Sequence, residues 1–151
     1  MNGVMMGTSE SPLLRELLSP LQRLRYKITP RRLYAFLRAR RDLRKYETEL
    51  RLLPVLVDPN RNSIDVGANR GTYTFFLARL SKQVFAYEPN PAMHQYLLGA
   101  VADNVSVSNA AISDRTGTAT FHVPRRHVGC HNTRGSLEAA VCSGPVCEFP
   151  V

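Results

Sequence analysis

The sequence has no apolar run that approaches the roughly 18 residues needed to cross a bilayer. Its N-terminus also lacks a basic region followed by a sustained apolar stretch, so it is not typical of a signal peptide. These absences argue against a transmembrane protein and against a secreted one. We therefore expect a cytoplasmic location.

Cysteine and histidine are scarce and show no ligand spacing. The three cysteines, Cys130, Cys142 and Cys147, are odd in number and form no C-x-x-C pair, and the four histidines have no recognised metal-binding pattern. This argues against a zinc site and against a full disulfide framework. We expect no bound metal and interpret the cysteines as buried or idle thiols.

What the sequence does have is the composition of one ordinary globular domain, with 151 residues, 44% of them hydrophobic and 21% charged. Its net charge of +8 is unevenly placed, because the stretch from Arg15 to Arg51 holds twelve Lys or Arg and only four acidic residues. We divide the chain into a disordered N-terminus (1–10), a basic helical segment (11–53) and a ligand-binding domain (54–151).

Two pairs, Ser11-Pro12 and Thr29-Pro30, predict helix starts in the basic segment. After the second pair, apolar residues from Leu33 to Leu53 recur at helical spacing, which predicts an amphipathic helix that ends at Pro54. We interpret its apolar stripe as packed on a sheet, with the charges in water. The alternative is binding to an anionic membrane surface or to nucleic acid, and nucleic acid is disfavoured because no aromatic stacking platform accompanies the cations.

The chain is organised around residues 63–89. A short β-branched run, Ser63 to Val66, predicts a buried strand, and a turn from Gly67 to Gly71 leads into a predicted helix over 72–80. A second strand over 84–87 ends at Glu88. In an open parallel sheet, ligands bind beyond the carboxyl ends of the strands, and an acid about 20 residues past the glycine turn accepts hydrogen bonds from ribose hydroxyls. This unit therefore predicts a nucleoside-containing ligand.

The glycine turn lacks the G-x-G-x-x-G pattern of dinucleotide sites. It carries instead a carboxylate, Asp65, just before Gly67, where a pyrophosphate would be repelled. A ligand with a cationic group is favoured, and S-adenosylmethionine has both an ammonium and a sulfonium. The turn alone would be compatible with any α/β protein, but Asp65 and Glu88 together favour the ligand site.

Further along, Asn90-Pro91 predicts a helix from Pro91 to about Ala102, and an alternating run predicts a third strand over 105–108. The tip of that strand, at Asn109 and Ala110, would lie beside the adenine, although Asn109 also suits a simple turn. A turn signal at 114–117 predicts a hairpin between 111–113 and 118–123, and 146–151 suits another strand.

Three segments, IDVGANRG, FAYEPNP and VSNAAISDRTGTATF, resemble in order the FkbM family of class I S-adenosylmethionine-dependent methyltransferases, over residues 46–137. The resemblance implies an α/β, doubly wound, Rossmann-like sheet of seven strands, preceded here by basic helices. The family's K-D-x-E-G strand is absent, so we expect a truncated fold that lacks its C-terminal half. The unpaired edge of the first strand would then invite self-association.

The resemblance implies a set of cofactor-binding residues, in which Asp65 meets the methionine amino group and Glu88 the ribose. The full set is Asp65, Gly67, Ala68, Asn69, Gly71, Glu88, Asn109 and Ala110. No general base is evident, so the catalytic residues stay unassigned. The implied reaction is O-methylation of a small molecule or saccharide. The alternatives are an inactive remnant that at most binds the nucleoside, and a module that binds anionic surfaces through its basic helix.

Overall fold

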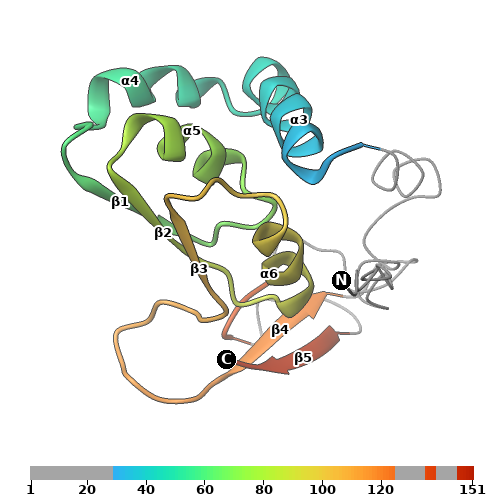
Figure 1. The fold of residues 1–151 in the computed structure, drawn as a ribbon. Helices are drawn as coiled ribbons and strands as arrows, with labels where there is room; N and C mark the ends of the chain where they lie inside the picture. Colours follow the sequence, from blue (N-terminus) through green and yellow to red (C-terminus); the bar gives the residue numbers. More distant parts are fainter. Residues whose placement is uncertain (1–28, 125–134, 139–145) are drawn as a thin grey trace, which may run out of the picture.

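The computed structural model describes residues 29–124, 135–138 and 146–151 (Figure 1). The expectations for the disordered N-terminus and for a helix starting at Ser11-Pro12 lie outside the described residues. The elements are listed here with their bounds: α3 Arg31–Lys45, η1 Thr48–Leu52, α4 Leu53–Leu56, β1 Asn62–Val66, α5 Thr72–Leu80, β2 Gln83–Tyr87, α6 Pro91–Leu98, β3 Val105–Ser108, β4 Thr120–Pro124 and β5 Val146–Pro150.

The centre of the fold is a parallel three-stranded sheet in the order β1-β2-β3. Helices α5 and α6 make the two crossovers, as alternation of strand and helix predicts. The predicted strands and α5 agree with the structure to within a residue at each end. Asn90 caps α6 by accepting a hydrogen bond from the Ala92 N–H at 3.0 Å, as its position before a proline predicts. However, α6 ends at Leu98, earlier than the predicted Ala102.

One face of the sheet is covered and the other is not. Val84 and Ala86 of β2 are buried against the helices, and Leu97 of α6 packs in the same cluster. Ile64 and Val66 of β1 alternate with Asp65 and point to the opposite face, where they are 64% and 60% exposed. Among the described residues, both crossover helices therefore lie on one side of a half-covered sheet.

Residues 29–53, the described part of the basic segment, form an outer layer over α5, on the side away from the sheet (Figure 1). The prediction of one helix ending at Pro54 is wrong, because the helix stops at Lys45 and Pro54 lies in the first turn of α4. The predicted packing on the sheet is also wrong, since α5 and α6 already cover the inner sheet face. Instead, Phe36 of α3 contacts Phe75 of α5, with 5.9 Å between ring centroids.

The predicted hairpin between 111–113 and 118–123 is wrong. Strand β4 pairs antiparallel with β5, near the end of the sequence, so that Phe121 faces Phe149. A turn signal at 114–117 depends only on the local sequence. Pairing with β5 gives β4 five paired residues, whereas the predicted partner, 111–113, would be a much shorter strand. The expectation of a strand within 146–151 is confirmed.

Cys147, in β5, is disulfide-bonded, so its interpretation as an idle thiol is wrong. The other two cysteines lie outside the described residues. Among the described helices, none combines the length and the apolar character that crossing a membrane requires.

Gly71 gives a test of the packing beneath α6. Its φ is +78°, and a Cβ at this position would lie 2.6 Å from Leu97 Cδ2. We expect Gly71→Ala to lower the free energy of unfolding by about 1–3 kcal/mol, from backbone strain and overpacking together. Urea unfolding measures this, with Gly117→Ala as the control because a Cβ there meets nothing within 4 Å. Equal stability of the two variants would contradict the described packing.

Candidate functional site

The loop that follows β1 is held in an unusual backbone conformation. Gly67, Asn69 and Gly71 have positive φ values of 75°, 51° and 78°, a region that glycine enters freely and asparagine tolerates. The N–H groups of Gly67 and Ala68 donate to the Tyr87 carbonyl at 2.9 and 3.0 Å, which ties the loop to the end of β2. A Cβ added at Gly67 would meet nothing within 4 Å. The loop therefore borders open space on the side of Gly67.

Glu88 joins this loop to the next one. Its carboxylate accepts hydrogen bonds from the N–H groups of Asn69 at 2.6 Å and Asn90 at 2.8 Å. The side chain is only 5% exposed. Burial raises the pKa of Glu88, the two N–H donors oppose this, and the nearby Asp65 carboxylate raises the pKa further. Glu88 is thus a buried acid whose charged form gains from any additional positive charge.

Asp65 faces the helices and caps α5. Its carboxylate accepts a 2.5 Å hydrogen bond from Thr74 Oγ1 and also bonds the Thr74 backbone N–H, in the first turn of α5. An acid at a helix N-terminus is stabilised by the free N–H groups and by the helix dipole. Burial nevertheless raises the pKa of Asp65. The described part of the chain offers neither Asp65 nor Glu88 a cationic side chain within ion-pair distance.

A pocket of about 160 Å³ lies at the carboxyl ends of β1 and β2. It is lined by Gly67, Asn69, Glu88, Pro89, Asn90, Met93, Phe121 and Gly135. Asn90, Met93 and Phe121 were not predicted to line it. Asn90 was interpreted only as a helix cap, although it follows directly on Glu88, and Phe121 reaches the pocket only because β4 pairs with β5.

Two polar atoms of pocket-lining residues are buried without a hydrogen-bond partner in the described chain. They are the acceptor Oδ1 of Asn69 and the donor Nδ2 of Asn90. Asn90 is 2% exposed, and its other amide atom is already used to cap α6. An unpaired buried amide group costs about 1–3 kcal/mol. The two atoms could offer a ligand one acceptor and one donor.

The other predicted site residues lie around the pocket without lining it. Asn109 donates through Nδ2 to the carbonyls of Glu88 and Pro89 at 2.8 and 2.9 Å, so it fixes the loop after β2. Ala68 is buried against Ala86 and Leu97. Gly71 lies on the helix side, and Ala110 is half-buried just past β3. Of the predicted set, the structure brings Gly67, Asn69 and Glu88 together at the pocket.

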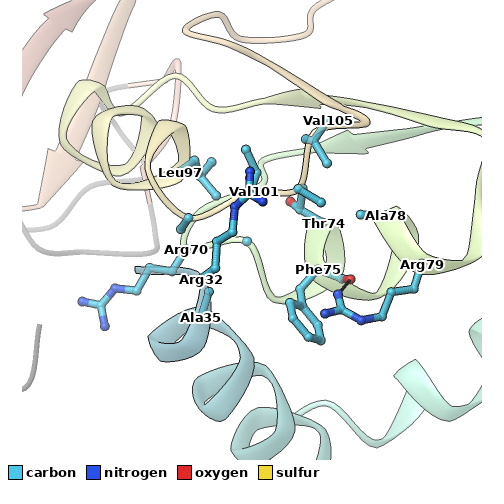
Figure 2. A pocket seen from close by; sticks show the side chains of 13 residues that line it. Arg32, Ala35, Arg70, Thr74, Phe75, Ala78, Arg79, Leu97, Val101 and Val105 are labelled. Atoms are coloured by element: carbon cyan, nitrogen blue, oxygen red, sulfur yellow. Dashed lines mark hydrogen bonds between the residues drawn. The ribbon is translucent and has the colours of Figure 1, made fainter. Parts of the chain in front are cut away.

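A second pocket, of about 200 Å³, lies between α3, α5 and α6 (Figure 2). Its walls are mostly apolar, with three cations, Arg32, Arg70 and Arg79, and no carboxylate. Figure 2 shows Arg70 pointing away from the other labelled side chains, while Arg79 bonds the Phe75 carbonyl at 2.7 Å. The three cations of this second pocket would repel a sulfonium ligand. The candidate site is therefore the pocket at Glu88.

A comparison with known protein families finds a match that covers the residues of this site. The methyltransferase FkbM domain matches residues 65–143, just over half of the chain. The chain belongs to the FkbM methyltransferase domain family. No curated protein and no solved structure gives a significant match. The FkbM match starts at Asp65 and includes the glycine loop, Glu88 and Phe121, which confirms the resemblance found in the sequence.

The raised pKa of Glu88 predicts how stability depends on pH. The folded protein holds this proton more tightly than the unfolded chain, so stability rises as pH falls from the raised folded pKa toward the ordinary value of 4.5. In Glu88→Gln that contribution is absent, and the slope over this window becomes shallower. Urea unfolding at a series of pH values measures the difference between the two slopes. Parallel curves would show that burial does not raise the pKa of Glu88.

Proposed function

We propose that the pocket at Glu88 holds the nucleoside part of S-adenosylmethionine, and that the chain serves methyl transfer to an oxygen of a small molecule or saccharide. The observation that carries this is the pair of buried carboxylates, Asp65 and Glu88, without a cationic partner in the described chain of an FkbM-family protein. Burial raises the pKa of both carboxyls, and at Glu88 the Asp65 carboxylate adds to this; a cationic ligand would favour the charged form of each.

The residues present fit such a ligand. Gly67 leaves open space beside the loop, so a ligand can approach the backbone. Each Glu88 oxygen accepts one backbone N–H and keeps a lone pair for a ribose hydroxyl. Asn69 Oδ1 and Asn90 Nδ2 supply one further acceptor and one donor. Met93 and Phe121 form an apolar wall of the kind that a purine base packs against.

S-adenosylmethionine supplies, when bound, a methyl group already activated on a sulfonium. The chain's own part is then to orient the ligand and to position the acceptor. Glu88 and the two asparagines fix the nucleoside, and Asp65, held by Thr74, acts on the methionine amino group directly or through water. No side chain lining the pocket is a clear general base besides Glu88, whose oxygens accept backbone N–H groups and are assigned here to the ribose. We therefore assign no catalytic base.

One observation favours a binding-only protein as the second candidate. Among the described residues, β1 has a single neighbour, β2, and the sheet face beyond Ile64 and Val66 is uncovered. In a doubly wound sheet the ligand crevice lies between the first strand and a neighbour on its other side. The described part of the chain supplies one side of that crevice. Saturable binding of S-adenosylmethionine without turnover on acceptor panels would favour this candidate.

Calorimetric titration with S-adenosylmethionine and with S-adenosylhomocysteine, a thioether that lacks the sulfonium charge, tests the site. We expect Glu88→Gln to weaken S-adenosylmethionine binding by about 10-fold or more, because a charge-assisted ribose contact and an anion are both lost. The ratio of the two affinities should also shift toward S-adenosylhomocysteine by about 3- to 10-fold, since only one ligand carries the sulfonium charge.

Asp114→Asn is the matched control, because this carboxylate is exposed and does not line the pocket. It should bind both ligands as the parent does. A Glu88→Gln variant that keeps its circular dichroism spectrum and binds both ligands normally would overturn the proposed site.

A further inference from the structure

Helix α3 buries one ion pair and exposes two of its leucines. Leu33 and Leu37 are 46% and 54% exposed. On the inner side, Asp42 is 5% exposed and forms an ion pair with Arg38 at 3.2 Å. Leaving leucines in water forfeits the free energy of apolar burial, and burying an ion pair adds a desolvation cost. The outer side of α3 is therefore not arranged to face water alone.

The exposed apolar side chains continue along the outer layer. Besides the two leucines of α3, the large hydrophobic residues exposed between residues 33 and 56 are Tyr46, Leu52, Val55 and Leu56. Val55 is 85% exposed. We call these six residues, with the exposed cations of α3, the outer surface. Figure 1 shows that α3 and α4 lie over α5 on the side away from the sheet, so this surface is remote from the Glu88 pocket.

Cations dominate the charge of the outer surface. Its exposed basic residues are Arg31, Arg32, Arg40, Arg41, Arg44 and Lys45. A shallow hollow along α3 is lined only by these cations and apolar groups, namely Phe36, Leu37, Arg40, Arg41, Arg44 and Lys45.

Two of these six cations are ion-paired, Arg32 with Asp103 and Arg41 with Asp42, and the other nearby acids bond α5. Glu49 and Glu47 accept hydrogen bonds from the Tyr73 hydroxyl of α5 at 3.0 and 3.4 Å, and Asp42 is buried. The outer surface is therefore apolar and positively charged.

We propose that the outer surface docks this protein on an anionic phospholipid bilayer. Leucine and valine side chains beside guanidinium groups match the acyl boundary beside the phosphate and serine headgroups. Single-stranded nucleic acid would need aromatic side chains on which bases stack, and the outer surface has only Tyr46. Scattered exposed apolar residues are ordinary on protein surfaces, but a group of this size beside one sign of charge marks an interaction surface.

The test is co-sedimentation of the full chain with vesicles of phosphatidylcholine, with and without about one third phosphatidylserine. Two double variants remove one property each: Arg44→Gln with Lys45→Gln removes charge, and Val55→Ser with Leu56→Ser removes apolar area. Arg61→Gln with Arg115→Gln and Leu98→Ser with Ile112→Ser are the matched controls, since these four side chains are also exposed but lie outside the outer surface.

We expect binding to the anionic vesicles that fades at about 0.5 M salt. The charge variant should weaken it about 10- to 30-fold, at roughly a tenfold factor or less for each cation removed. The apolar variant should weaken it about 10-fold, and the controls should stay within about twofold of the parent.

Equal binding by the parent and both double variants would overturn the proposal, as would absence of vesicle binding. It would also be overturned if the charge variant lost binding to duplex or single-stranded nucleic acid while its binding to vesicles was unchanged. Circular dichroism of all four double variants checks that a loss of binding is not a loss of fold.

Discussion

The buried carboxylate of Glu88 is the contact on which the pocket depends. It bonds the backbone of the glycine loop through Asn69 and the backbone of the next loop through Asn90. Without it, two loops that leave neighbouring strands would have no direct link at this point. Hydrogen bonds to a charged acceptor contribute about 1.5–3 kcal/mol each, which offsets part of the cost of burying the charge. Glu88 is therefore held in place by two hydrogen bonds, and its charged form would still be stabilised by a nearby cation.

The outer helical layer supports the same loop from the other side. Asp42 of α3 accepts a hydrogen bond from Thr72 Oγ1 at 2.9 Å, at the first residue of α5. Arg38, its ion-pair partner, reaches the Arg70 carbonyl within the glycine loop at 3.4 Å. The first turn of α5 thus receives two carboxylates, one from β1 and one from α3, where the helix dipole favours negative charge. This explains why an ion pair of α3 is buried at all.

The sequence predicted the parts of the fold that are locally encoded. Strand, glycine turn, helix and strand over 62–87 follow from short-range periodicity and from turn residues, and these agree closely with the structure. The partner of β4 could not be predicted, because pairing with β5 depends on contacts across more than twenty residues. The end of α3 could not be predicted either, because neither residue at 46–47 is a glycine or a proline. There, tertiary contacts override helix propensity.

The candidate site was predictable to a similar degree. The motif located Gly67, Asn69 and Glu88 at the pocket. Asp65 bonds Thr74 and does not line the pocket, and its contact with the ligand stays a prediction. Sequence spacing places Asp65 at the end of a strand, and only packing decides which way its side chain points. Phe121 was missed for the same reason as the β4–β5 pairing.

Some polar groups at the site have a structural role, and others are available only to a ligand. This difference bears on whether the site binds a ligand. Asp65 caps α5 and Asn109 fixes a loop, so both would be retained in a protein that binds nothing. Asn69 Oδ1 and Asn90 Nδ2 have no such role in the described chain, and each unpaired group costs about 1–3 kcal/mol. A domain of marginal stability gains when such groups are paired or replaced, although the Asn90 side chain also caps α6 through Oδ1. Their presence beside open space at Gly67 therefore argues for a site that still binds a polar ligand, whether or not the chain completes the methyl transfer.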